Sequence, residues 1–326
     1  MVLRLYASLG LIVIGILVGY VIQIWSRSGR FGLPYDLKKI QRRMQKFALL
    51  GLYPVAFVGA VWIAPTDNAS LAVLPFVALF ALGLGGMLAY FLARLQRMTR
   101  RQTGSYVISG WFTNIGSIGG LVCFFLIGEE AFALVPIYKL LEEFSYYGFG
   151  FPVAQSFSSS VSGSGREGLI ARIIRIGRDP FVVVVLGSIA LGFVLNISGL
   201  SRPAFYGTLN AILIPLASFI LLVSIGMAMR LESVRRYARA GLGILLVKNL
   251  LVPAATTALA FFLGLGSIAN GVPLQVVLVL SSMPAAFVSI VPSTLYDLDV
   301  DLANSNWLIS NAALIIVIPV LSFILK

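Results

Sequence analysis

Residues 114–120 read NIGSIGG and lie in the middle of an apolar run that covers about 104–127. Glycine and asparagine are poor helix formers, so a helix through this run is expected to break here. A second interruption, SSMP at 281–284 with Pro292 beyond it, lies in the apolar run at about 273–296. Proline breaks a helix because it lacks a backbone N–H. The sequence therefore predicts two broken helices, one in each half of the chain.

These two runs belong to a series of apolar segments along the whole chain. Hydrophobic residues make up 59% of the 326 residues and charged ones only 11%, too few charges to cover a soluble surface. Each segment is long enough to cross roughly 30 Å of hydrocarbon, where a backbone without water satisfies its polar groups as a helix. We therefore predict an all-α membrane protein with ten transmembrane helices, at about 3–24, 44–64, 70–93, 104–127, 129–155, 180–198, 206–229, 239–265, 273–296 and 302–325.

The basic residues lie almost entirely in short loops after the first, third, fifth and seventh predicted spans, although the formal net charge is +12. This is the positive-inside pattern of membrane topology rather than a phosphate-binding groove, so no nucleic-acid partner is expected. It predicts a multi-pass protein of the cell (cytoplasmic or inner) membrane, embedded in the lipid bilayer, with both termini outside the cytoplasm. One loop departs from the pattern, because Asp297, Asp299 and Asp301 fall on the predicted cytoplasmic side.

The segment SFSSSVSGSGREG at 156–168 is small and flexible and divides the ten spans five and five. Basic residues are spaced along the apolar stretch 169–177 that follows, which predicts a short amphipathic helix on the inner surface. An odd number of spans per half puts the halves in opposite orientations, the inverted-repeat plan of many secondary transporters. We predict a first five-helix repeat over 1–155, a cytoplasmic linker over 156–179 and a second, inverted repeat over 180–326.

The fifth predicted span contains three charged residues, Lys139, Glu142 and Glu143, followed by Tyr146. A charge at that depth costs at least about 2.5–3.5 kcal/mol, so it normally faces a partner or a wet cavity. The functional interpretation is a site for substrate or for a coupling proton. The structural alternative is a Lys139–Glu143 pair at i,i+4 that neutralises itself and leaves Glu142 unexplained.

Other polar residues within the spans have two interpretations each. Lys248 in the eighth span either carries a coupling charge or extends its ammonium to the cytoplasmic surface. Asn114 either hydrogen-bonds a polar substrate or caps the half-helix after the break. The glycines that follow Asn114 either line the site or pack against another helix. The tenth predicted span carries a polar stripe of Asn304, Ser305, Asn306, Ser310 and Asn311. We expect the members nearest the end of the span to be wet, and Ser310 and Asn311 to join helices.

Several function classes are excluded or weakened by composition. The chain has no His and one Cys, Cys123, so neither a Ser-His-Asp triad nor a structural zinc site is expected. There is no Walker lysine motif for nucleotide binding. We expect no enzyme, no metal and no cofactor, since only Lys139 with Glu142 or Glu143 remains as a catalytic pair. A non-transporting receptor or scaffold and a channel stay open as alternatives to a secondary transporter.

At motif level, most of the chain resembles the auxin efflux carrier family, which includes plant auxin exporters and bacterial malate or malonate carriers. NIGSIGGL at 114–121 followed by GEE at 128–130 is similar to the family's Asn-Thr-Gly-x-x-Gly-x-Pro and Gly-acid-acid motifs. MPAA at 283–286, Ser310-Asn311 with Pro319, and Pro54 in the second span also resemble family features. Ile115 replaces the motif's Thr, Leu121 its Pro, and Glu142-Glu143 a common amide pair.

The resemblance implies the fold of bile-acid-symporter-like carriers, in which a transport domain with crossing broken helices (spans four and nine) moves against a scaffold. It implies a small-molecule substrate, an organic acid in the known members, bound by Asn114, Ile115, Gly116, Ser117, Pro284, Ala285, Glu142, Glu143, Tyr146 and Pro54. Lys139 and Lys248 with the two glutamates are the candidate coupling charges. Two carboxylates favour proton coupling or a substrate with a positive group. Whether the carrier forms a homodimer is left open.

Overall fold

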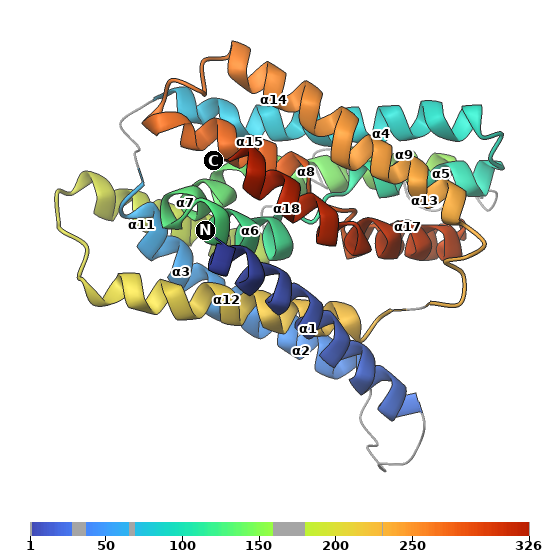
Figure 1. Ribbon diagram of the computed structural model, residues 1–326, viewed down its shortest axis with the longest axis horizontal. Helices are drawn as coiled ribbons and strands as arrows, with labels where there is room; N and C mark the ends of the chain where they lie inside the picture. Colours follow the sequence, from blue (N-terminus) through green and yellow to red (C-terminus); the bar gives the residue numbers. More distant parts are fainter. Residues whose placement is uncertain (1, 28–36, 65–68, 159–179, 230, 326) are drawn as a thin grey trace.

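The computed structural model describes residues 2–27, 37–64, 69–158, 180–229 and 231–325 (Figure 1). Every regular element in these ranges is helical, and short π or 3-10 turns, labelled η, interrupt several α-helices. The elements are α1 (Val2–Arg27), α2 (Leu37–Phe47), η1 (Ala48–Leu52), α3 (Tyr53–Val61), η2 (Ala69–Val73), α4 (Leu74–Leu95), α5 (Arg100–Trp111), η3 (Ile115–Gly119), α6 (Gly120–Leu126), α7 (Glu129–Tyr138), η4 (Lys139–Leu141), α8 (Glu142–Ser145), η5 (Tyr146–Gly150), α9 (Phe151–Ser156), α11 (Pro180–Ile197), α12 (Phe205–Gly226), α13 (Ala238–Leu246), η6 (Val247–Leu251), α14 (Val252–Phe262), η7 (Ala269–Gly271), α15 (Val272–Ser281), η8 (Phe287–Ser289), α16 (Ile290–Leu295), α17 (Val300–Ala312) and α18 (Leu314–Ile324).

Five helical stretches in the described ranges are long and apolar enough to cross a membrane. They are Tyr6–Ser26, Lys39–Val61, Ser70–Leu95, Phe205–Gly226 and Ala238–Phe262. A sixth results if α17 and α18, which meet at an angle of 43°, form one span. The length and apolar character of these helices support an all-helical membrane protein. The ten crossings and the inverted repeats stay a prediction.

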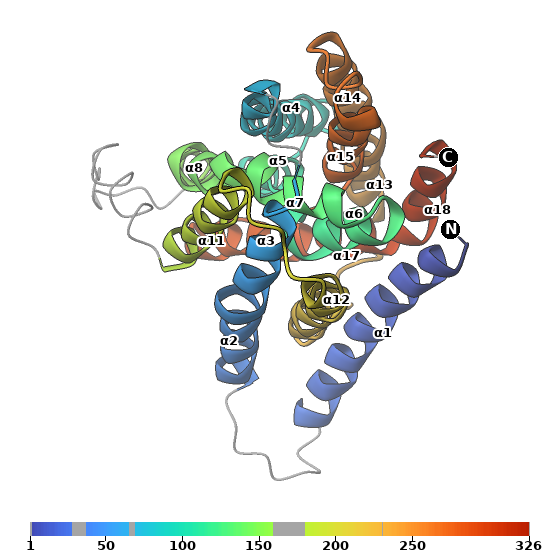
Figure 2. The same cartoon turned by 90° about the vertical axis from the view of Figure 1, so that its left-hand side faces the viewer.

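The helices form two groups, each of which combines the two halves of the chain. In one group α1 packs along α12, and α3 packs against α11 and α12. In the other, α4 packs along α5 and α14, and α17 packs against α5 and α13. Figure 2 shows α6 and α7 between these groups, and contacts join α6 to α1 and α7 to α3.

Two glycines allow α1 and α12 to cross with their backbones in contact. A Cβ atom at Gly19 would lie 2.0 Å from the Val223 carbonyl oxygen, and one at Gly226 would lie 2.1 Å from the Ile16 carbonyl oxygen. Small residues at such crossings let membrane helices gain van der Waals contact that larger side chains would prevent. Glycine is therefore required at both positions by the close approach.

We expect Gly226→Ala to lower the free energy of unfolding by about 1–3 kcal/mol, because the added methyl group overlaps backbone atoms. Gly83→Ala in α4 is the matched control, since nothing lies within 4 Å of its Cβ position. There alanine is expected to be neutral or to stabilise by up to about 1 kcal/mol. Unfolding of both variants in detergent micelles measures the difference. Equal stability of the two would contradict the steric account.

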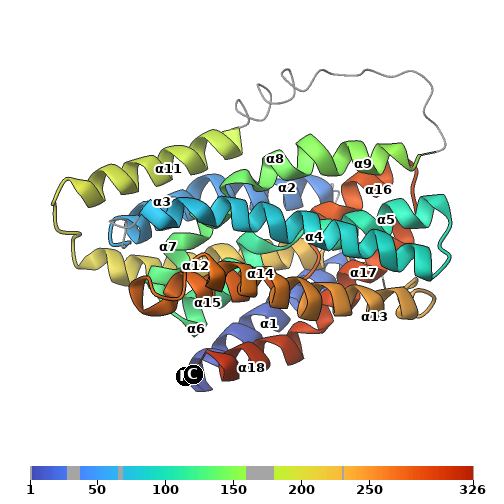
Figure 3. The same ribbon diagram turned by 90° about the horizontal axis from the view of Figure 1, so that it is seen from above.

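The acidic turn after α16, which departs from the positive-inside pattern, pairs with Arg101 and with the hydroxyl of Tyr237. Arg101 Nη2 is 2.8 Å from Asp297 Oδ1, and the Tyr237 hydroxyl donates to Asp299 Oδ2 at 2.8 Å. Burial and this hydrogen bond raise the pKa of Tyr237. The two ends of the described chain also lie beside each other (Figure 3). The side of the membrane that they face stays a prediction.

The predicted linker lies mostly outside the described residues. Residues 156–158 close and follow α9, whereas 159–179, including the amphipathic helix predicted at 169–177, lie outside them. The division into 1–155, 156–179 and 180–326 therefore stays a prediction.

Candidate functional site

Both predicted interruptions are real breaks in helical geometry. After α5 the backbone is extended at Phe112 (φ −81°, ψ 125°), and the helix resumes at Ile115. After α15 the chain leaves the helix at Ser282, is extended at Ala286 (φ −72°, ψ 146°) and resumes at Phe287. The first break lies just ahead of the glycine-rich stretch, which is itself helical. The sequence prediction, which relied on the glycines at 116–120, therefore placed the first break a few residues too far along the chain.

The two breaks pair with each other through their backbones. The Asn114 N–H donates to the Pro284 carbonyl at 2.9 Å, and the Ala286 N–H donates to the Phe112 carbonyl at 3.0 Å. Between these bonds Thr113 and Ala285 form an isolated antiparallel bridge. The predicted site residues Asn114, Pro284 and Ala285 are thus brought together. Each break supplies hydrogen bonds that the other lost by leaving the helix.

The residues after the first break form a compact polar turn. Asn114 is 7% exposed, and its Oδ1 accepts a hydrogen bond from Ser117 Oγ at 2.6 Å. Its side chain makes no capping bond to the backbone, so the capping alternative is wrong. Ile115 is buried, and a methyl group added at Gly116 would lie 3.3 Å from Lys139 Nζ. The close-packing alternative holds at Gly119, where a Cβ would meet Leu280 at 2.7 Å.

The charged cluster of the fifth predicted span reaches the same turn. Lys139 Nζ lies 3.0 Å from Oε2 of Glu142, which is 5% exposed. The ion pair therefore includes the glutamate that the sequence left unexplained. Oε1 of Glu142 lies 3.0 Å from the Tyr146 hydroxyl, which also accepts a hydrogen bond from the Thr113 N–H at 2.8 Å. Glu143 is partly exposed on the neighbouring position of α8.

Lys248 reaches the break from the opposite side. It is 1% exposed, so the surface-seeking alternative is wrong. Its ammonium contacts Thr113 Oγ1 and the carbonyl oxygens of Gly110 (3.3 Å) and Phe112 (3.4 Å). Thr113 therefore joins two charged groups, because its N–H leads to Tyr146 and Glu142 while its hydroxyl accepts from Lys248.

Three residues of this site were missed by sequence reasoning. Thr113 immediately precedes Asn114, Tyr53 immediately precedes the predicted Pro54, and Ser310 was assigned only to helix joining. The Tyr53 hydroxyl lies 2.8 Å from Ser218 Oγ and 3.4 Å from the Gly116 carbonyl, and Ser310 Oγ accepts from the Ala285 N–H at 3.2 Å. Pro54 itself is buried at the start of α3. Proximity along the chain to a predicted residue was the available signal for the first two.

Three π-helical turns surround the paired breaks. η3 follows Asn114, η5 begins at Tyr146 and η6 contains Lys248. A π turn inserts an extra residue into a helix and re-aims the side chains next to it, and such turns occur frequently at functional sites. Here they present the polar side chains toward the break.

The polar stripe of the tenth predicted span is buried, against the expectation that its end would be wet. Asn304 is 2% exposed and Asn306 is fully buried. Asn306 Nδ2 donates to Ser109 Oγ at 3.3 Å, which ties α17 to α5. Among the described residues no group of three or more His, Cys, Asp or Glu side chains is placed to hold a metal ion.

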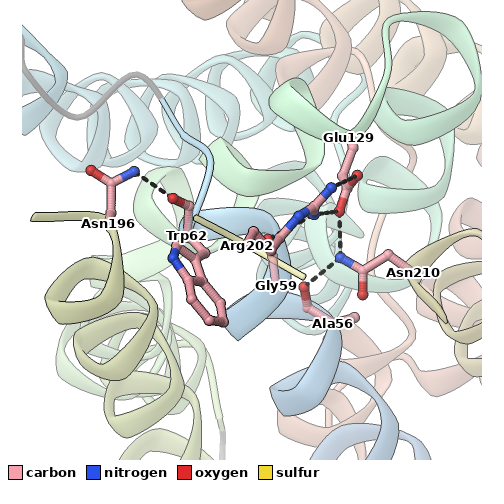
Figure 4. A network of polar contacts seen from close by, with 7 residues as sticks. All are labelled: Ala56, Gly59, Trp62, Glu129, Asn196, Arg202 and Asn210. Carbon is pink, nitrogen blue, oxygen red and sulfur yellow. Dashed lines mark hydrogen bonds and ion pairs between the residues drawn. The ribbon is translucent and has the colours of Figure 1, made fainter. Parts of the chain in front are cut away.

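A second polar cluster lies away from the breaks, where α3, α7, α12 and the turn before α12 meet (Figure 4). Arg202 pairs with Glu129 through both terminal guanidinium nitrogens, with Nη2 3.1 Å from Oε2, and its Nη1 donates to the Gly59 carbonyl at 2.9 Å. Asn210 Nδ2 donates to Glu129 Oε1 at 2.6 Å and to the Ala56 carbonyl at 3.1 Å. This cluster, called the Arg202–Glu129 cluster below, joins residues of both halves of the chain. We expect it to stabilise their packing against each other.

The chain is similar in sequence to two proteins described as transporters. No protein-family model matches it. It is 25% identical over 256 residues to an uncharacterised transporter of Methanocaldococcus jannaschii, covering 77% of this chain and 78% of the relative. It is 22% identical over 310 residues to an uncharacterised transporter of Methanothermobacter thermautotrophicus, covering 95% of each chain. Together with the apolar helices, these similarities support a membrane transporter.

Proposed function

We propose that the chain is a ten-span secondary carrier that moves a small organic acid across the cell membrane by alternating access. The observation that carries the proposal is the pairing of two helix breaks beside buried charged residues. Broken helices at the membrane centre expose backbone groups that bind ions and substrates in many transporters. The resemblance of 114–121 and 283–286 to the auxin efflux carrier family supports the same assignment.

The half-helices that leave the breaks favour an anionic substrate. η3 with α6, and η8 with α16, each begin at a break with no side-chain cap on their first N–H groups. Such uncapped N-termini carry a partial positive charge and free donors suited to a carboxylate. The Lys139 ammonium lies beside Gly116 in the first turn of one of them. Asn114 and Ser117 add polar groups at the same place.

The two helix groups support a moving and a stationary part. The group of α1, α3, α11 and α12 is proposed as the scaffold, and the group of α4, α5, α13, α14, α15 and α17 as the transport domain. The segments of both breaks, with Lys248, belong to the second group and would move together, whereas Tyr53 of the same site lies on α3 in the first group. Proton coupling is proposed through Glu142, which contacts Lys139 and Tyr146 and lies next to the break through Thr113.

The proposal is tested by pH-gradient-driven uptake of labelled malate, malonate and indole-3-acetate into proteoliposomes. We expect Asn114→Ala to lower the uptake rate by about tenfold to a hundredfold, because a buried hydrogen bond to a charged group contributes about 1.5–3 kcal/mol. Asn270→Gly is the control, since Asn270 is exposed, lies in a turn with φ 54° that glycine adopts readily, and is separated from the second break by the whole of α15.

Each outcome of the uptake experiment decides something. Uptake that Asn114→Ala reduces and Asn270→Gly leaves unchanged supports a carrier with its site at the first break. Equal uptake by all three proteins contradicts that site. No uptake of any of the three acids by folded wild-type protein contradicts the organic-acid proposal and directs the search to cationic or zwitterionic compounds.

A further inference from the structure

Lys248 is a buried cation that forms no ion pair within the described part of the chain. Its ammonium has three N–H donors, and three oxygens accept them: two backbone carbonyls and the Thr113 hydroxyl. The acid nearest along the hydrogen-bonded chain is Glu142, which Lys248 reaches only through Thr113 and Tyr146. The groups in direct contact with this ammonium are therefore dipoles rather than a carboxylate.

The oxygens that surround Lys248 are available because α5 ends there. In a continuing helix the Gly110 carbonyl would accept from the amide of Asn114 or Thr113. Those amides donate instead to the Pro284 carbonyl and to the Tyr146 hydroxyl. The end of a half-helix thus presents a free carbonyl and a partial negative charge to the break. A positive group at this point is stabilised by that partial charge.

The three oxygens that contact Lys248 are of the types that bind an exchangeable cation in other proteins. Unwound carbonyls and the C-terminal ends of half-helices coordinate sodium ions or protons in transporters with broken helices, and a hydroxyl is a further oxygen ligand of the same hardness. Lysine places one compact positive charge on a flexible four-carbon stem, so it satisfies such a site without any ion from solution. Two positive charges among these three oxygens would repel each other.

We propose that the Lys248 ammonium is a tethered cation that occupies the alkali-ion position at the end of α5, so that the protein works without sodium. This inference deepens the proposed function, on which it rests for its meaning in transport. It also links α5 to η6 permanently, since the cation cannot leave with the substrate. The Thr113–Ala285 bridge then stays assembled through the transport cycle.

The test compares sodium binding and stability of purified full-length protein in NaCl and in choline chloride of equal ionic strength. We expect no ²²Na⁺ binding by the wild type and a Tm that agrees within about 1 °C in the two salts. Lys248→Ser removes the ammonium and leaves the oxygens with room for an ion. We expect the Tm of Lys248→Ser in choline chloride to lie below that of the wild type. We expect it to rise by about 3 °C or more in saturating NaCl.

Lys248→Gln is the matched control, because its amide is neutral, fills much of the space and still donates two hydrogen bonds. We expect it to show no response to sodium. Sodium bound by the wild type, or a folded Lys248→Ser protein whose Tm is the same in both salts, overturns the inference. If Lys248→Ser yields no folded protein, the wild-type binding measurement decides.

Uptake assays separate this inference from the proposed function. A protein that carries none of the three test acids but shows the expected sodium pattern contradicts the proposed function and leaves the tethered cation standing. A protein that carries them and needs sodium to do so contradicts the tethered cation alone.

Discussion

Arg202→Met is expected to lower the free energy of unfolding by about 3 kcal/mol, the lower end of the range for breaking a buried ion pair. Among the described residues, the change leaves Glu129 with Asn210 as its single side-chain hydrogen-bond donor and with no counter-charge. The Arg202 and Glu129 side chains are only 14% and 18% exposed, so solvent screens the pair weakly. Unfolding in mixed micelles with increasing SDS measures the change.

Arg101→Met is the control for this prediction, because it breaks an arginine–carboxylate pair whose side chains are 50% and 70% exposed. Exposed pairs contribute about 0–1 kcal/mol, so we expect little change. The double variant Arg202→Met with Glu129→Gln should recover part of the lost stability, since it removes the orphaned carboxylate. If Arg202→Met lowers the free energy of unfolding no more than Arg101→Met does, the Arg202–Glu129 cluster does not stabilise the fold as proposed.

Glu142→Gln is expected to lower uptake at least about a hundredfold, equivalent to about 2.7 kcal/mol. The substitution removes the carboxylate that neutralises Lys139 and contacts the Tyr146 hydroxyl. A charge within the membrane costs about 2.5–3.5 kcal/mol, and this sets the scale of the estimate, because the Glu142 carboxylate lies 3.0 Å from Lys139 Nζ. Proton coupling through Glu142 predicts that residual uptake also loses its dependence on pH. Proteoliposome uptake at several external pH values measures both effects.

Glu143→Gln makes the same chemical change one residue further along α8, at a partly exposed position. We expect it to retain most of the uptake and its pH dependence. Normal transport by both variants with unchanged pH profiles would contradict a coupling role for either glutamate. A larger loss from Glu143→Gln than from Glu142→Gln would move that role to Glu143.

Local sequence patterns predicted the features that depend only on neighbouring residues: the helices, their interruptions and the charged positions within them. Helix through the apolar runs follows from hydropathy and length, and the interruptions near 114 and 284 follow from weak helix formers and proline. The charged residues within the fifth and eighth predicted spans were recognised because a charge in a long apolar run is costly whichever neighbours it meets. These properties do not require knowledge of any distant contact.

Contacts between distant segments were not predictable in the same way. The break before Ile115 lies at Phe112–Asn114 because those residues pair with 284–286, and no local propensity encodes that pairing. Asn304 and Asn306 were expected to be partly wet, but α17 packs them against α5. The position of a polar residue near a span end does not reveal which helix covers it.

By itself, then, the sequence determined that the chain is helical, that it belongs in a membrane and that its helices weaken near Asn114 and Pro284. Apolar length, charge placement and backbone propensity act within a few residues, so they can be read directly. Only the tertiary structure decided that Lys248 meets Thr113, that Glu142 holds Lys139, and that Arg202 closes on Glu129. In a low-dielectric interior, a charge is stabilised by whatever oxygen or counter-charge the fold brings to it, and that partner is chosen by the packing of whole helices.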